Sequence, residues 1–104
     1  MINYQIIIEE SARLDLISVI DYIIDVFQEP LIAFKMQESI VNEIISLERF
    51  PKRAKALEDE PFKSMGYRVT YVKNYSIFYK VIDESQEVRV MRILYNRREW
   101  QDLL

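Results

Sequence analysis

The spacing of apolar residues changes at Tyr67, and this change limits the choice of fold more than any single motif does. Before this point, apolar side chains recur every three or four residues, as they do on one face of an amphipathic helix. From Tyr67 onward they alternate with other side chains, which is the period of a β-strand. The chain is therefore predicted to have helices in its first half and a sheet in its second.

The first half is predicted to contain one strand and two helices. The β-rich run Tyr4–Ile8 predicts a strand, and Ser11 is a suitable N-cap for the helix that follows it. Pro30 suits the first turn of a second helix, which Phe50-Pro51 would end. The apolar face of the first helix is predicted to comprise Leu16, Ile20, Ile23, Ile24 and Phe27. A short connection makes the two helices antiparallel neighbours.

The second half is predicted to be a loop followed by a three-stranded antiparallel meander. Residues 51–66 lack periodicity, whereas 67–72, 75–82 and 88–95 read as strands separated by polar turns. The fold class is α+β, with the helical hairpin packed on one face of a mostly antiparallel sheet that the meander completes. The first strand belongs to this sheet, at an edge or in the centre. Residues 1–104 are expected to form a single domain.

Composition excludes several kinds of chemistry. The chain has no cysteine and no histidine, so thiol nucleophiles, histidine-based triads and the usual zinc sites are excluded. Gly66 is the only glycine, whereas phosphate-cradling loops and dinucleotide-binding turns need several. No cofactor and no metal are expected.

Charge is divided unevenly along the chain. Residues 1–48 carry a net charge of −7 and residues 49–104 a net charge of +4. This asymmetry indicates either a face for a charged partner or simply well-solvated acidic helices. No apolar run is long enough to cross a membrane, and the first residues do not read as a signal peptide. A cytoplasmic protein without a membrane partner is expected.

Several segments, taken in order, resemble the RelE/ParE superfamily of toxins. They are Ala12 to Leu16, Asp21 to Ile23, Leu47 to Pro51, Gly66 to Arg68, Asn74 to Val81 and Arg92 to Trp100. The order and spacing of these segments carry the resemblance, and the sequence around Arg92–Trp100 is more similar to the ParE side of the superfamily.

The resemblance implies the toxin of a type II toxin–antitoxin system. Such a protein arrests growth when it is free and is neutralised when a cognate antitoxin binds it. ParE-like members inhibit DNA gyrase without cutting nucleic acid, whereas RelE-like members cut messenger RNA on the ribosome. A third possibility is a member that only binds its antitoxin. Contact with operator DNA is expected only indirectly, through the antitoxin complex.

If the chain is a nuclease, the resemblance assigns catalytic roles to Arg68 and Arg98, with Tyr95 as a proton donor. Other members of the family have further basic residues at the positions of Thr70 and Ser76, so the nuclease set is incomplete. A strongly basic surface would help contact with ribosomal RNA, but the pI is about 5.0.

A second group of residues is predicted to bind the target or the antitoxin. It comprises Arg92, Arg97, Trp100, Leu103 and Leu104. Arg92 alternates with apolar residues of the last strand, so it is expected either to contact a partner or to pair with Asp15 or Asp21 on the first helix. The alternating tyrosines from Tyr67 to Tyr79 favour a core face over a base-stacking surface.

Overall fold

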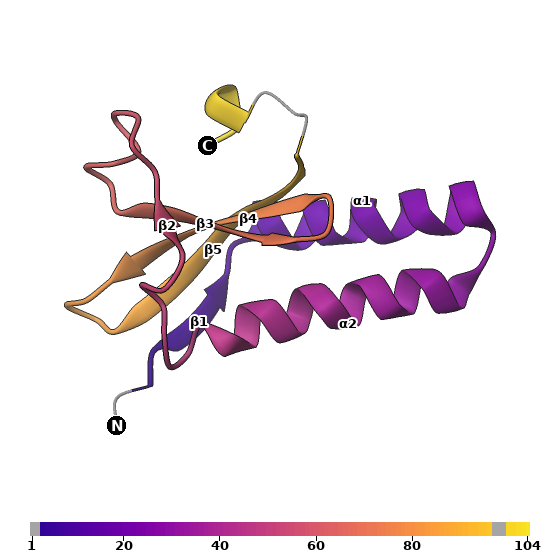
Figure 1. The fold of residues 1–104 in the computed structure, drawn as a ribbon, viewed down its shortest axis with the longest axis horizontal. Coiled ribbons are helices and arrows are strands. Elements are labelled where there is room, and N and C mark those ends of the chain that lie inside the picture. The colour runs from indigo at the N-terminus through magenta and orange to yellow at the C-terminus, as the bar shows by residue number, and fades with distance from the viewer. Residues whose placement is uncertain (1–2, 97–99) are drawn as a thin grey trace.

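The computed structural model of the protein describes residues 3–96 and 100–104. A five-stranded sheet has two long helices over one face and the C-terminal segment over the other (Figure 1). The elements are β1 (Gln5–Ile8), α1 (Glu10–Phe27), α2 (Pro30–Ser46), β2 (Lys55–Ala56), β3 (Tyr67–Val72), β4 (Tyr75–Ile82), β5 (Glu87–Tyr95) and the 3₁₀ helix η1 (Trp100–Asp102). The predicted α+β fold is confirmed.

The strand order is β1-β5-β4-β3-β2, which places β1 at an edge of the sheet. β1 runs parallel to β5, and the other neighbouring strands are antiparallel. The parallel pairing follows from the chain path, because the helical hairpin carries the chain away from β1 before the meander begins. The alternation that predicted the meander corresponds to β3, β4 and β5.

The prediction that Ser11 caps the first helix is wrong. The N-cap is Glu9, whose side chain makes no capping hydrogen bond, and α1 begins at Glu10. The reason is that the Glu9 backbone N–H still donates to the Val90 carbonyl of β5, at 3.0 Å. The Glu9 carbonyl then accepts from the Arg13 N–H, at 3.0 Å, so the strand passes directly into the helix.

The turn between the helices is short, as predicted. Gln28 ends α1 in the left-handed conformation, with φ of 52°, and its N–H donates to the Ile24 carbonyl. Pro30 occupies the first turn of α2, where its missing N–H costs no hydrogen bond. In Figure 1 the hairpin extends well past the end of the sheet.

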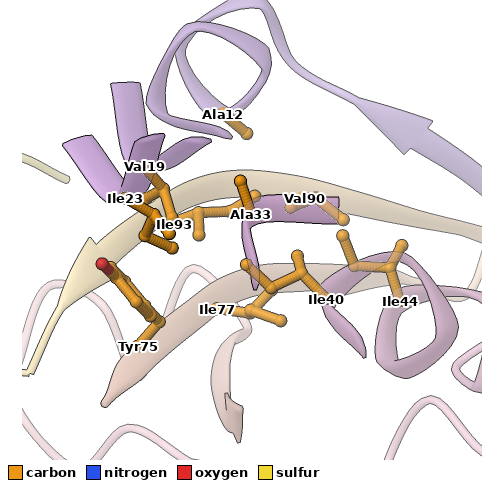
Figure 2. Close-up of a cluster of buried hydrophobic side chains, with 10 residues drawn as sticks. All are labelled: Ala12, Val19, Ile23, Ala33, Ile40, Ile44, Tyr75, Ile77, Val90 and Ile93. Atoms are coloured by element: carbon orange, nitrogen blue, oxygen red, sulfur yellow. The ribbon is translucent and has the colours of Figure 1, made fainter. Parts of the chain in front are cut away.

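The main core lies between the helices and the sheet. Its residues come from α1, α2, β4 and β5 and point toward one another (Figure 2): Ala12, Val19, Ile23, Ala33, Ile40, Ile44, Tyr75, Ile77, Val90 and Ile93. Only part of the predicted face of α1 is buried there, since Ile24 and Phe27 are exposed. The buried residues of α1 are Ala12, Val19 and Ile23, and Ile24 lies about 140° around the helix from Val19. Phe27 lies close to the buried face in angle but is exposed at the end of the helix.

A β-bulge in β5 changes which side chains share a face. Phe78 pairs with Arg92 and Tyr79 with Val90, so Met91 is an extra residue. Val90 and Ile93 consequently both face the helices although they are three positions apart. Strict alternation predicts that Arg92 shares a face with Val88 and Val90. The bulge makes this prediction wrong.

The opposite face of the sheet carries a second apolar cluster. It contains Leu57, Tyr67, Val69, Phe78 and Leu94, with Phe62, Met91, Trp100, Leu103 and Leu104 packed against it.

Three of the four alternating tyrosines, Tyr67, Tyr75 and Tyr79, are buried, as expected for core residues. Tyr71 differs, with 58% of its surface exposed.

The segment 51–66 is mostly loop, but it contains β2, which the sequence did not predict. This two-residue strand pairs Lys55 with Val69 and Ala56 with Arg68. Gly66 precedes β3 with φ of 81°, a backbone conformation that favours glycine. Within residues 3–96 and 100–104, no helix is long and apolar enough to span a membrane.

Candidate functional site

The hairpin extends beyond the sheet, and a groove opens where the sheet ends. This hairpin groove has a volume of about 700 Å³. The helices contribute Val19, Tyr22, Val26 and Phe27 from α1 and Ile32 and Met36 from α2. The end of the sheet contributes Asn74, Tyr75 and residues 93–95. The groove therefore continues the apolar layer between helices and sheet past the last residue that the sheet covers.

Large apolar side chains of the groove are exposed to solvent. Tyr22 is 60% exposed, Phe27 58% and Ile32 43%. Neighbouring Val26, Leu31 and Phe34 on the same end of the hairpin are also exposed. Large exposed apolar patches are typical of sites where a protein interacts with another protein. We call the hairpin from Asp21 to Met36 the open end, and the remainder of the two helices, which lies over the sheet, the closed end.

An ion pair between Asp15 and Arg92 joins the wall of the groove to β5. The Asp15 carboxylate accepts from Nε and Nη2 of Arg92, at 2.6 and 2.8 Å. It also accepts from the backbone N–H of Ile93, at 2.9 Å. Both side chains are largely buried, and the bond to Asp15 raises the pKa of the Arg92 guanidinium. Of the two partners predicted for Arg92, Asp15 is the one observed.

Arg92 also holds the C-terminal segment. Its Nη1 donates to the Leu103 carbonyl, at 3.0 Å. Trp100 packs against Phe62 and Phe78, with ring centroids 5.4 Å apart in both cases. Leu103 and Leu104 lie against the same cluster. Trp100, Leu103 and Leu104 of the group predicted to bind a partner are thus placed on the face of the sheet opposite the helices, with Arg92 as their anchor.

Arg68 lies at the other end of the sheet and stabilises the loop before β2. Its Nη1 donates to the carbonyls of Ala54, at 2.7 Å, and Lys52, at 3.2 Å. The hydroxyl of the neighbouring Tyr79 donates to the Pro51 carbonyl, at 2.7 Å. Burial raises the pKa of the Tyr79 phenol to about 12. The contacts of Arg68 are those of a structural residue.

Tyr95 is far from Arg68. Arg68 pairs with Tyr79, whereas Tyr95 pairs with Tyr75 at the opposite end of β4. Four residues of strand separate these two levels, which is roughly 13 Å. Tyr95 instead packs edge to face on Tyr75 at the groove, with ring centroids 5.7 Å apart. The structure therefore does not bring these two predicted catalytic residues together.

Arg97 and Arg98, the other predicted basic site residues, lie outside the described residues. Arg89 of β5 pairs with Glu9 at 2.7 Å and Glu87 at 3.2 Å. Within the described part of the chain, no group of three acidic side chains is arranged to hold a metal ion.

The sequence analysis missed the hairpin groove. A signal for it was present in α1, where apolar residues occur on nearly every side of the helix, including Leu14, Ile17, Tyr22 and Val26. An amphipathic surface helix needs only one apolar stripe. An excess of apolar residues indicates a second contact, but only the end point of the sheet shows where that contact lies.

Comparisons with solved structures support the fold. The toxin–antitoxin complex RelBE2 from Mycobacterium tuberculosis matches with a TM-score of 0.67 and 24% identity, over 91% of this chain and 93% of that chain. The chromosomal ParDE system from Pseudomonas aeruginosa matches with a TM-score of 0.71 and 21% identity, over 88% and 95%. The isolated Escherichia coli RelE toxin matches with a TM-score of 0.64 and 16% identity, over 96% and 92%.

The sequence itself matches one family. No curated protein matches this chain. The family described as the ParE toxin of the type II toxin–antitoxin system parDE matches residues 6–100, which include both long helices and every strand except Gln5, the first residue of β1. The chain therefore belongs to the ParE toxin family of type II toxin–antitoxin systems.

Proposed function

We propose that the protein is a growth-inhibiting toxin that acts in the cytoplasm on DNA gyrase without cutting nucleic acid, and that a cognate antitoxin neutralises it. The observation that carries the gyrase proposal is the separation of Arg68 from Tyr95 by about 13 Å along the strands. Ribose-directed cleavage needs its acid, base and charge-stabilising groups around one phosphate. The match to the ParE family supports the same choice.

The face of the sheet opposite the helices gives further support. It is filled by the apolar cluster around Tyr67, Phe78 and Leu94, and the C-terminal segment lies over it. A nuclease site needs polar side chains that converge in a space open to RNA. In a gyrase inhibitor, the segment from Trp100 to Leu104 would supply the contact with the target, and Arg92 would hold it in place.

The hairpin groove is the proposed site for the antitoxin. Two of the similar solved structures are described as a toxin–antitoxin complex and a toxin–antitoxin system, so a partner segment is expected somewhere on this fold. Each large apolar side chain that the partner covers would contribute about 1.5–3 kcal/mol. The exposed Tyr22, Phe27 and Ile32 therefore offer enough apolar surface for tight binding, if partner side chains cover them well.

A ribosome-dependent endonuclease remains the second candidate because Arg98 lies outside the described residues. Two assays on cells that express the chain alone separate the functions. Gyrase trapped on DNA with intact messenger RNA supports the proposal, whereas ribosome-dependent cuts with normal plasmid topology contradict it. Growth without either effect would indicate a member that only binds its antitoxin.

Substitution of Arg68 and Arg98 by alanine sharpens this test. A nuclease that relied on both guanidinium groups would lose cleavage by roughly a hundredfold or more. A gyrase inhibitor should instead lose activity when Trp100 is replaced by alanine. Circular dichroism of each variant checks that the fold is retained, since Arg68 also stabilises a loop.

A further inference from the structure

The two ends of the helical hairpin differ in how their carboxylates are paired. At the closed end, three carboxylates on the helices each meet an arginine: Glu10 with Arg13, Asp15 with Arg92, and Glu43 with Arg53. At the open end, Asp21 and Asp25 have no ion pair or side-chain hydrogen bond to any residue in 3–96 or 100–104. At the closed end, Glu38 alone among the helix carboxylates has no such partner in the described residues, so two of the three unpaired helix carboxylates lie at the open end.

Asp21 and Asp25 lie on α1 beside Tyr22, which lines the groove, although neither carboxylate lines the groove itself. They are four residues apart, so they lie one above the other on the helix surface. Together with Tyr22 and Ile24 they line a shallow depression, and Tyr22 also lines the hairpin groove. An occupant of the groove that contacts Tyr22 would thus place its flanking side chains next to both carboxylates.

The shape of the site favours a helix over an added strand. Strand addition needs free backbone donors and acceptors at a sheet edge. At this end of β5, the Ile93 N–H already donates to Asp15. The groove between two helices and the sheet end instead offers apolar positions such as Val26, Phe27 and Ile32, which suit the i, i+3, i+4 side chains of an amphipathic helix.

We propose that the hairpin groove receives an amphipathic helix whose apolar stripe is flanked by basic side chains about one turn apart, facing Asp21 and Asp25. The inference rests on the proposed function, in which this helix belongs to the cognate antitoxin. Lysine and arginine suit such a rim, because their stems cover apolar surface while their charged ends reach the carboxylates. Lys35 on α2 is the only basic residue of the open end, where Asp21, Asp25 and Glu29 outnumber it.

Two labelled helical peptides test this inference. They share one leucine stripe and differ only in having lysines or glutamates on its flanks, and fluorescence anisotropy measures their binding to the full chain. Because exposed ion pairs are individually weak, we expect the lysine peptide to bind about tenfold more tightly at low salt. The preference should shrink as salt is added.

Variants of Asp21 and Asp25, the rim of the groove, test whether these two carboxylates cause the preference. D21N/D25N should erase it, and D21K/D25K should reverse it in favour of the glutamate peptide. The control E38Q/E84Q removes two exposed carboxylates that line neither the groove nor the depression beside it, and it should leave the preference unchanged. I32E should abolish binding of both peptides, which shows that they occupy the groove.

Three results would overturn the inference: equal binding of the two peptides, a preference that survives D21N/D25N, or binding of neither peptide. Growth arrest by the wild-type chain, expressed alone, is scored separately. Arrest without a charge preference defeats the inference and leaves the toxin proposal standing. A rim-dependent preference without arrest defeats the toxin proposal and leaves the chemistry of the groove standing.

Discussion

The closed and open ends of the hairpin are built from the same two helices but have opposite relations to solvent. At the closed end, Ile40 of α2 is fully buried against the sheet. Two turns earlier, at the open end, Ile32 has the same side chain and is 43% exposed. The helices do not change between these positions, whereas the sheet beneath them stops at the turn between β3 and β4 (Figure 1).

An apolar stripe on a helix therefore predicts that this face of the helix will be covered, but it does not predict which element or partner covers it. The closed end is covered by β4 and β5 of the same chain, so its side chains contribute to folding. At the open end, Ile23 and Ala33 are buried in the same core, whereas Tyr22, Phe27 and Ile32 are exposed and remain available for binding. Four substitutions test this difference between the two ends, and they are given in order of decreasing expected effect on stability.

Ile40→Ala should have the largest effect. Removal of a fully buried isoleucine side chain costs about 2–5 kcal/mol, since the rigid core cannot close the cavity. Urea unfolding followed by circular dichroism measures this loss. A decrease in the free energy of unfolding of less than about 0.5 kcal/mol would contradict tight packing at the closed end.

Tyr79→Phe should alter the dependence of stability on pH. The raised pKa, about 12, lies above the ordinary value near 10, so the native state binds the phenolic proton more tightly than the unfolded state. This contribution is complete below pH 10 and is lost as pH rises from about 10 to about 12. The wild type should lose at most about 2.5 kcal/mol over this interval through Tyr79.

Urea midpoints measured across this pH range test the prediction. Tyr79→Phe should show a shallower alkaline loss, although it starts lower because the Pro51 carbonyl loses its donor. A smaller slope should remain, because burial also raises the pKa of Tyr67 and Tyr75.

Arg92→Met should cost about 2 kcal/mol, because it leaves the largely buried Asp15 carboxylate without its cation. It should also release the C-terminal segment from its bond to the Leu103 carbonyl. Trp100, the only tryptophan, reports this release as a red shift of its emission. Arg13→Met breaks an exposed pair and should change neither signal. An unshifted emission in Arg92→Met would show that the anchor is dispensable.

Ile32→Ala should have the smallest effect on stability, within about 0.5 kcal/mol, since its side chain already contacts water. It should nevertheless weaken rescue of growth by the cognate antitoxin, measured by titrating antitoxin expression against a fixed toxin level. Rescue at the wild-type antitoxin level would argue against the groove as the antitoxin site. A large loss of stability would erase the contrast with Ile40.

Local sequence signals predicted most of the fold. Pro30 marked the start of α2, and the change of period at Tyr67 marked the start of the meander. These signals work because propensity and burial act on neighbouring residues. The start of α1 was missed because it depends on the pairing of Glu9 with Val90, which are distant in sequence.

The candidate site was less predictable for the same reason. The bulge at Met91 decides which face Arg92 occupies, and it depends on the register between β4 and β5. The pairing of Arg92 with Asp15 was one of two alternatives from sequence, because charge complementarity does not specify distance. The hairpin groove exists only because the helices extend further than the strands, which is a property of the assembled fold.

The hydrogen bond from the Ile93 N–H to Asp15 has a consequence for solubility. β1 pairs with β5 only as far as Val90, so the outer side of β5 has no strand beside it from that point. An unoccupied strand edge invites pairing with another copy and growth of stacked, fibre-forming sheets. A single carboxylate on α1 takes the place of the missing strand, so one side chain both anchors an arginine and keeps the sheet from becoming a template.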